Sequence, residues 1–311
     1  MASVPVILVA VDGSEQSMHT VAYLSRVLSP KNAGIELFHV LAEAPESFYD
    51  QGETEGTADF EAPIEKWKGS RALRMDQFMD EARKTLTDAG FPAGSITAAI
   101  QPRKSGIARD IINKSAIGYT AVAIGRKGFG GLPDFMLGNV AAKLADSLHN
   151  VPLIIVGGQP ENRKVVVGFD RSHGIRKGLD QVSPLLSRKL EEILLCHIVR
   201  PLSGPHPARS SYFSSREEAH WLDENSRKIV PVLVDAKQRL SRAGFDQKAF
   251  RTAIIKEKTS RAEGILAEAE ALGAGTIIIG RRGATSVEEF AMGRVTRKII
   301  YMVYDRAIWI V

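Results

Sequence analysis

The feature that most constrains this chain is an internal repeat, because two copies of one sequence pattern fold into two copies of one unit. The stretch Val9–Ser14 (VAVDGS) returns as Val167–Ser172 (VGFDRS), 158 residues later. Further along, Ala123–Gly125 (AIG) matches Ile278–Gly280 (IIG) at an offset of 155 residues. The offset drifts by only a few residues, a change that surface loops tolerate. We therefore predict two tandem domains of the same fold.

Each copy alternates short apolar runs with longer amphipathic stretches, which is typical of βαβ units and a parallel sheet. The expected strands lie near residues 5–11, 34–40, 95–101, 120–125 and 151–156, and near 164–169, 192–198, 250–256, 275–280 and 306–311. The predicted fold class is α/β, with one five-stranded parallel sheet per domain.

The domain boundaries follow from the punctuation of the chain. We place the domains at residues 1–158 and 163–311, joined by the Gly- and Pro-containing stretch 157–162. Residues 44–69 and 201–220 are interpreted as long connections, which in compact domains are often functional or mobile. Their role is left open.

Composition narrows the setting of the protein. No apolar run approaches the ~18–20 residues that a membrane helix needs, so no membrane association is expected. The lone cysteine, Cys196, rules out an intramolecular disulfide and favours the cytoplasm. Residues 1–158 carry 15 Lys+Arg against 18 Asp+Glu, whereas residues 159–311 carry 26 against 18. The basic half could attract phosphates or an acidic partner, whereas nucleic acid is not expected as a partner.

The candidate site combines an aspartate with a glycine pattern at the carboxyl ends of two strands. Asp12 and Asp170 end the first expected strand of each copy. The pattern Gly-x2-Gly-x9-Gly follows the fourth strand of each copy, at Gly125, Gly128 and Gly138 and at Gly280, Gly283 and Gly293. Glycines permit positive φ and close backbone approach, and a helix start offers amides to an anion. The aspartate could accept hydrogen bonds from ribose hydroxyls, so the pattern predicts a nucleotide site.

These motifs resemble the universal stress protein family, and the resemblance covers both halves almost end to end. It implies a sheet of order 3-2-1-4-5, pairing of the domains through their last strands, and binding of ATP, with Mg²⁺ alongside, in a subset of members. It further implies that Asp12 would hold ribose, Val40 would contact adenine, and Gly125, Gly128 and Gly138 would bind phosphates. In the second copy, Asp170, Ile198, Gly280, Gly283 and Gly293 would do the same.

Both copies depart from the family pattern directly after the third glycine. Nucleotide-binding members carry Ser or Thr there, but this chain has Asn139 and Arg294. Asn139 could still cap the helix and donate its amide to a phosphate. Arg294 could grip a phosphate or fill the cradle in its place. We therefore expect Arg294→Ser either to strengthen ATP binding in the second copy or to weaken it about tenfold or more, and we favour the first outcome slightly.

No catalytic set is found in either half: no Ser/His/Asp arrangement, metal-ligand cluster or Walker lysine. His39 and His197 repeat in register, and we interpret them as half-buried strand histidines with backbone partners. The favoured hypothesis is a stress-response or regulatory protein that binds an adenine nucleotide without enzyme activity or with weak ATPase activity at most. The alternatives are a ligand-free scaffold with degenerate sites and an adenine-nucleotide hydrolase.

Two further expectations concern assembly and binding. The apolar last strands, near 151–156 and 306–311, are unsuited to exposed edges, so the chain is expected to be an intramolecular pseudo-dimer. A further homodimer stays an open alternative. In the first copy, Gly128→Val is expected to abolish ATP binding by blocking backbone approach, with the fold largely retained.

Overall fold

The computed structural model describes residues 4–42, 61–128, 136–203, 212–256, 258–283 and 292–311. Within these residues the strands form one ten-stranded sheet, in the order β3-β2-β1-β4-β5-β10-β9-β6-β7-β8. The first half supplies β1 (Val6–Ala10), β2 (Gly34–Leu41), β3 (Ile96–Pro102), β4 (Ala121–Gly125) and β5 (Leu153–Val156). The second half supplies β6 (Lys164–Gly168), β7 (Glu192–Ile198), β8 (Phe250–Ile255), β9 (Thr276–Ile279) and β10 (Ala307–Ile310). Each half has the order 3-2-1-4-5 along its own chain, which confirms the prediction.

The two halves join through their last strands. Strands β5 and β10 pair antiparallel, with Leu153 opposite Ile310 and Val156 opposite Ala307. The other strand pairs are parallel. Both junction strands are buried along their length, because pairing removes two apolar edges from solvent at once. The expected pseudo-dimer is therefore confirmed.

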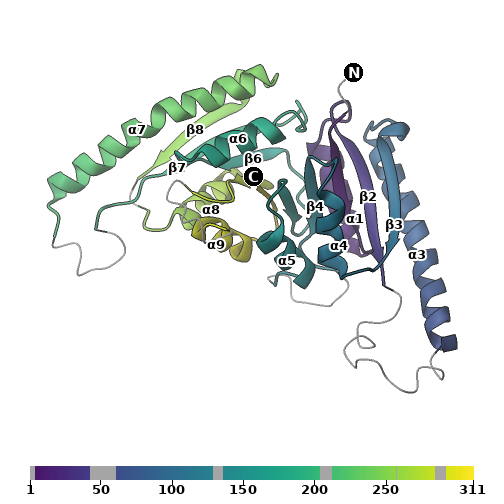
Figure 1. The fold of residues 1–311 in the computed structure, drawn as a ribbon. Helices are drawn as coiled ribbons and strands as arrows, with labels where there is room; N and C mark the ends of the chain where they lie inside the picture. The colour runs from purple at the N-terminus through teal and green to yellow at the C-terminus, as the bar shows by residue number, and fades with distance from the viewer. Residues whose placement is uncertain (1–3, 43–60, 129–135, 204–211, 257, 284–291) are drawn as a thin grey trace.

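Helices cover both faces of the sheet. One face packs against α1 (Glu15–Val27), α3 (Glu61–Asp88), α6 (His173–Val182) and α7 (Ser215–Arg242). The other packs against α4 (Ile107–Ser115), α5 (Asn139–Ser147), α8 (Arg261–Leu272) and α9 (Arg294–Met302). Single turns, η2 (Ala93–Ser95) and η4 (Gln247–Ala249), precede β3 and β8. Figure 1 shows α3 running beside β3 at one end of the sheet and α7 beside β8 at the other.

The alternation of strand side chains explains this layering. In β1, Ile7 and Val9 belong to the core on the α1 face, whereas Leu8 and Ala10 belong to the core on the α4 face. Successive side chains of a strand point to opposite faces, so a strand covered on both faces has to be apolar throughout. This is why the strands could be found in the sequence as unbroken apolar runs.

The interpretation of the two long connections is wrong in part. Residues 61–69 belong to α3, and residues 215–220 belong to α7. Ser214 accepts a hydrogen bond from Glu217 N–H and the Glu217 carboxylate accepts one from Ser214 N–H, which forms a capping box at the start of α7. The spacing Ser-x-x-Glu is a readable helix start that the interpretation overlooked. The remaining parts, residues 43–60 and 204–211, lie outside the described residues.

A buried polar network crosses between the halves. The Trp309 indole donates from Nε1 to Tyr23 Oη at 2.8 Å, and Tyr23 Oη lies 2.8 Å from Thr276 Oγ1. Tyr23 comes from α1 of the first half, and its two partners come from strands of the second. The exposed fractions are 0% for Tyr23 and Trp309 and 1% for Thr276. Each of the three polar groups therefore depends on the others for a partner.

Two further observations bear on chemistry elsewhere in the chain. Cys196 is buried, and burial raises the pKa of its thiol to about 12, which agrees with its interpretation as an inert core residue. Across the described residues, no helix combines the length and apolarity that crossing a bilayer requires.

Candidate functional site

The first strand of the first half ends in a rigidly held carboxylate. Asp12 Oδ1 accepts hydrogen bonds from Ser14 N–H at 3.0 Å and from Ser17 Oγ–H at 2.7 Å. Ser14 Oγ in turn accepts from Ser17 N–H and so caps α1. Gly13 between them has φ of 85°, a left-handed conformation that favours glycine. This turn holds Oδ1 inside the loop and directs Oδ2 outward.

The glycine loop after β4 meets this carboxylate. A Cβ atom at Gly128 would overlap Asp12 Oδ2, and one at Gly125 would lie 2.9 Å from Gln16 Cγ. In the second half, a Cβ at Gly283 would lie 3.1 Å from Asp170 Oδ2. The structure thus brings the aspartate and the glycine loop together in both halves, because the carboxyl ends of parallel strands share one edge of the sheet.

The glycines work through space and not through backbone conformation. The described glycines with positive φ include Gly13 and Gly158 but none of the six in the Gly-x2-Gly-x9-Gly patterns. The expectation that these six use positive φ is therefore wrong. Close approach is confirmed in the first half. The second half is roomier, since a Cβ at Gly280 or Gly293 would meet its nearest neighbour at an ordinary 3.4 Å.

The third glycine of each pattern begins the last helix. Gly138 caps α5 and Gly293 caps α9, and neither cap has a side-chain hydrogen bond. The expectation that Asn139 caps α5 is wrong, because Asn139 already lies inside the helix as its first residue. Gly138 N–H donates to Arg126 O at 2.8 Å, so the amides left without helical partners are those of the first turn after it.

The histidines and the apolar residues proposed for the site lie deeper. His39 Nδ1 donates to Val11 O at 2.8 Å, and His197 Nδ1 donates to Phe169 O at 2.7 Å. Burial lowers the pKa of both imidazoles. This confirms that they have backbone partners, although His39 is fully buried. Val40 and Ile198 are core residues on the α4–α8 face, and neither lines the hollows described next.

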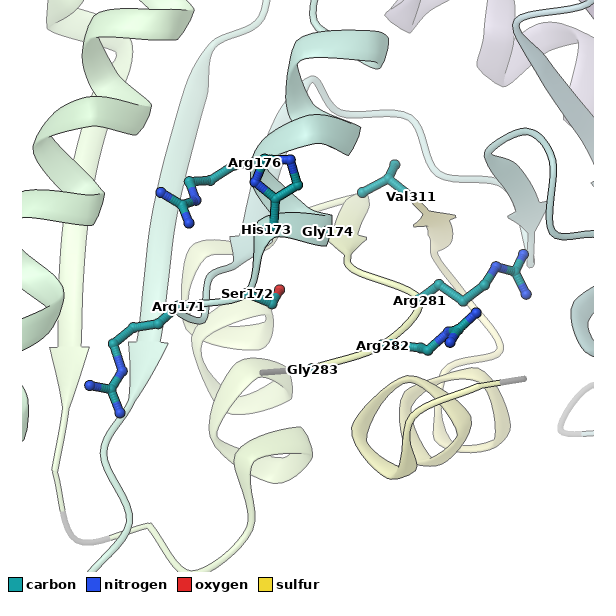
Figure 2. Close-up of a pocket in the computed structure, with 9 residues that line it drawn as sticks. All are labelled: Arg171, Ser172, His173, Gly174, Arg176, Arg281, Arg282, Gly283 and Val311. Atoms are coloured by element: carbon teal, nitrogen blue, oxygen red, sulfur yellow. The ribbon is translucent and has the colours of Figure 1, made fainter. Parts of the chain in front are cut away.

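Hollows open at corresponding places in the two halves, beside the starts of α1 and α6. The first has a volume of about 710 Å³ and is lined by Ser14, Glu15, Gln16, His19, Arg126, Lys127, Gly128, Gly158, Gln159, Tyr304 and Asp305. The second has a volume of about 560 Å³ and is lined by Arg171, Ser172, His173, Gly174, Arg176, Arg281, Arg282, Gly283 and Val311. Figure 2 shows Ser172 and Arg282 around the second hollow, with Arg171 and Arg281 extending away from each other.

One substitution between the repeats accounts for much of the difference between the hollows. Gln16 donates from Nε2 to Val156 O at 3.0 Å and to Gly158 O at 3.1 Å, so its side chain fills space beside the glycine loop. The second half carries Gly174 at the corresponding position. The backbone around α6 is consequently left more open. Sequence comparison of the two copies could have found this difference.

The second half also concentrates positive charge at this edge. The pKa of Arg261 is lowered chiefly by burial and then by the neighbouring Arg200, Arg171 and Arg294, while Asp170 acts in the opposite direction. Arg294 is exposed at the start of α9, where the first half has a neutral asparagine. The two sites therefore share their geometry and differ in charge.

Comparisons with known proteins match the whole length of the chain. The model of the universal stress protein family matches residues 4–157 and 161–301. A curated universal stress protein from Mycolicibacterium smegmatis is 25% identical over 199 residues, and the match spans 62% of this chain and 63% of that protein. A universal stress protein from Archaeoglobus fulgidus has a TM-score of 0.58 at 16% identity, covering 98% of this chain and 97% of that one. A functionally unknown protein from Pseudomonas aeruginosa has a TM-score of 0.53 at 12% identity, covering 99% and 92%. These structural likenesses concern the fold.

Proposed function

Because the chain belongs to the universal stress protein family, we propose that it is a cytoplasmic stress-response protein that binds ATP or a related adenine nucleotide. The observation that carries the proposal is the meeting of Asp12 and Gly128 beside the start of α5. It unites in one place an oriented carboxylate, a backbone that a ligand can approach closely, and the positive end of a helix.

The carboxylate suits a ribose. Asp12 Oδ1 is occupied by Ser14 and Ser17, whereas Oδ2 accepts no hydrogen bond from the described residues and faces Gly128. A fixed acceptor of this kind can bind vicinal hydroxyl groups without losing side-chain freedom on binding. The same arrangement recurs at Asp170, where Oδ1 accepts from Ser172 N–H at 2.9 Å.

The start of α5 suits phosphates. The first-turn amides of a helix have no partner inside the helix and carry its positive dipole, so they attract anions. Lys127, between Gly125 and Gly128, adds a cation to the same loop. No group of three or more His, Cys, Asp or Glu able to hold a metal occurs among the described residues. Mg²⁺ would therefore take its ligands mainly from phosphate oxygens and water.

The first half is the stronger candidate. Its glycine loop is tight, with little room for side chains at Gly125, Gly128 and Gly138. Such fit is expected where backbone itself contacts the ligand. In the second half, Arg294 adds a full charge at the helix start and the loop is roomier, which favours weaker or different anion binding. Binding at neither half would favour the scaffold alternative.

Calorimetric titration of ATP with Mg²⁺ tests the proposal on the full chain. We expect the wild type to bind, and Gly128→Val to lose the first-half site because its side chain displaces the Asp12 carboxylate. Gly69→Val is the matched control, since a Cβ at Gly69 meets nothing within 4 Å. Circular dichroism confirms that each variant is folded. Equal ATP affinity in wild type and Gly128→Val would contradict the site, and no ATP binding by the wild type would contradict the function.

Small molecules released from the purified protein provide a second, independent test. Mass spectrometry of the supernatant after denaturation is expected to detect an adenine nucleotide in the wild type and less of it in Gly128→Val. A related nucleotide in place of ATP would keep the site and change its ligand.

A further inference from the structure

Two arginines cross between the halves at the glycine loops. Arg126 follows the first glycine of its pattern and donates from Nη1 to the carbonyl oxygen of Ile300 in α9, at 2.6 Å. Arg281 follows the first glycine of the other pattern and donates from Nη1 to the carbonyl oxygen of Ala145 in α5, at 2.8 Å. Donors and acceptors are related by the same 155-residue offset as the glycine patterns. The two contacts are therefore reciprocal.

The backbone of each arginine is tied into the site of its own half. Arg126 N–H donates to Val156 O at 2.7 Å, and Arg126 O accepts from Gly138 N–H at 2.8 Å. Arg281 makes the two corresponding bonds, at 2.7 and 2.9 Å. One residue thus connects the first glycine, the third glycine and the last strand of its own half.

The carbonyl groups that accept these side chains lie at the far ends of the site helices. Ala145 and Ile300 belong to the last turns of α5 and α9, where carbonyl groups lack partners within the helix. A guanidinium there satisfies a carbonyl and interacts favourably with the negative end of the helix dipole. The helix whose start opens one site is therefore held at its end by the glycine loop of the other site.

Both contacts are buried enough to be rigid. Arg126 is 2% exposed, and burial lowers the pKa of its guanidinium. Burial and then the neighbouring Arg282 lower the pKa of Arg281 to about 10, so it stays charged at neutral pH. In Figure 2 the Arg281 side chain points away from Ser172 and the second hollow. A buried cation bound to a helix end resists displacement, because breaking the bond leaves a charge without its partner.

We propose that Arg126 and Arg281 are positioning residues, each of which sets the nucleotide affinity of the opposite half. Arg281 fixes the end of α5 and thereby the amides at its start, which belong to the first-half site. Arg126 does the same for α9 and the second-half site. Each half is then completed by a residue from the other, which gives the pseudo-dimer a role beyond burying apolar edges. This inference rests on the proposed function.

The test measures one half while changing the other. Gly283→Val first disables the second-half site, so that calorimetry reports ATP binding to the first half alone. In that background Arg281→Met removes the donor and retains an apolar side chain of similar length. We expect ATP affinity at the first half to fall by about fivefold or more, within the range of typical coupling between sites. Arg281→Lys keeps the charge and is expected to recover part of the affinity.

A control and a reciprocal experiment complete the design. Lys298→Met removes a cation from the exposed side of α9, where it pairs with Glu263, and should leave first-half affinity unchanged. Arg126→Met, in the Gly128→Val background, is expected to lower any ATP affinity of the second half. Circular dichroism and urea midpoints check that the variants are folded.

The outcomes separate the two proposals. ATP binding to the Gly283→Val protein with unchanged affinity in its Arg281→Met derivative would overturn the positioning role and leave the proposed function intact. No ATP binding to the folded Gly283→Val protein would overturn the proposed function of the first half and this inference with it. A loss of affinity that Arg281→Lys partly restores, with Lys298→Met unchanged, supports the inference.

Discussion

Removing one hydroxyl group, in Tyr23→Phe, is expected to weaken the joint between the halves. Tyr23 Oη accepts from the Trp309 indole and shares a hydrogen bond with Thr276 Oγ1. All three side chains are almost completely buried, so water cannot replace the lost partner. The substitution leaves the indole N–H without an acceptor and takes one partner from the threonine hydroxyl.

The size of the effect follows from the number of groups affected. A buried polar group left without a partner costs about 1–3 kcal/mol. The indole N–H carries that full cost, and the threonine hydroxyl carries part of it. We therefore expect the free energy of unfolding to fall by about 2–4 kcal/mol. This is a large share of the total of roughly 5–15 kcal/mol that is typical of folded proteins.

Urea unfolding of wild type and variant, followed by circular dichroism, measures this change. The control is Tyr212→Phe, because Tyr212 is 76% exposed and its hydroxyl keeps access to water. Its unfolding free energy should stay within about 0.5 kcal/mol of wild type. The double variant Tyr23→Phe/Trp309→Phe removes donor and acceptor together. A Tyr23→Phe protein as stable as the control would refute the reasoning that the network joins the halves.

Three further outcomes are expected. Gly128→Ala should lower ATP affinity strongly because its Cβ overlaps Asp12 Oδ2, whereas Gly280→Ala, whose Cβ has ordinary contacts, should bind anions as the wild type does; calorimetry of both checks this. Arg294→Ser, in a Gly128→Val background, should strengthen ATP binding at the second half, since it removes one of several clustered cations; an unchanged titration would mean that this charge is idle. The pKa of His39 is lowered in the folded protein, so the unfolded chain binds the extra proton and stability falls as pH drops below about 6.5; urea midpoints between pH 7.5 and 5 should fall less in His39→Gln.

Much of the fold could be predicted from the sequence, because the signals were local and repeated. Strands buried on both faces have to be apolar along their whole length, so runs such as Val6–Ala10 could be located within a residue or two. The matching offsets implied two copies of one sheet. Asp12 and Gly128 could be expected to meet because strand ends converge at one edge, whatever the details of the loops between them.

The local geometry of the site could not be predicted in the same way. Glycine is compatible with positive φ and with tight packing, and the sequence does not distinguish the two uses. Only the packing of Asp12 against Gly128 shows that space is the reason for the glycine. Similarly, Asn139 has the chemistry of a helix cap, but Gly138 takes that place because its N–H is bound to Arg126 O.

By itself, the sequence determined the repeat, the parallel sheets, the apolar last strands and the identity of the candidate site residues, since each depends on residue type and spacing within one half. Only the tertiary structure decided how the halves complete one another. The bonds from Arg126 to Ile300 and from Trp309 to Tyr23 join residues 174 and 286 positions apart. Such contacts leave no periodicity in the sequence, because they arise only when the antiparallel pairing of β5 and β10 brings the two halves together.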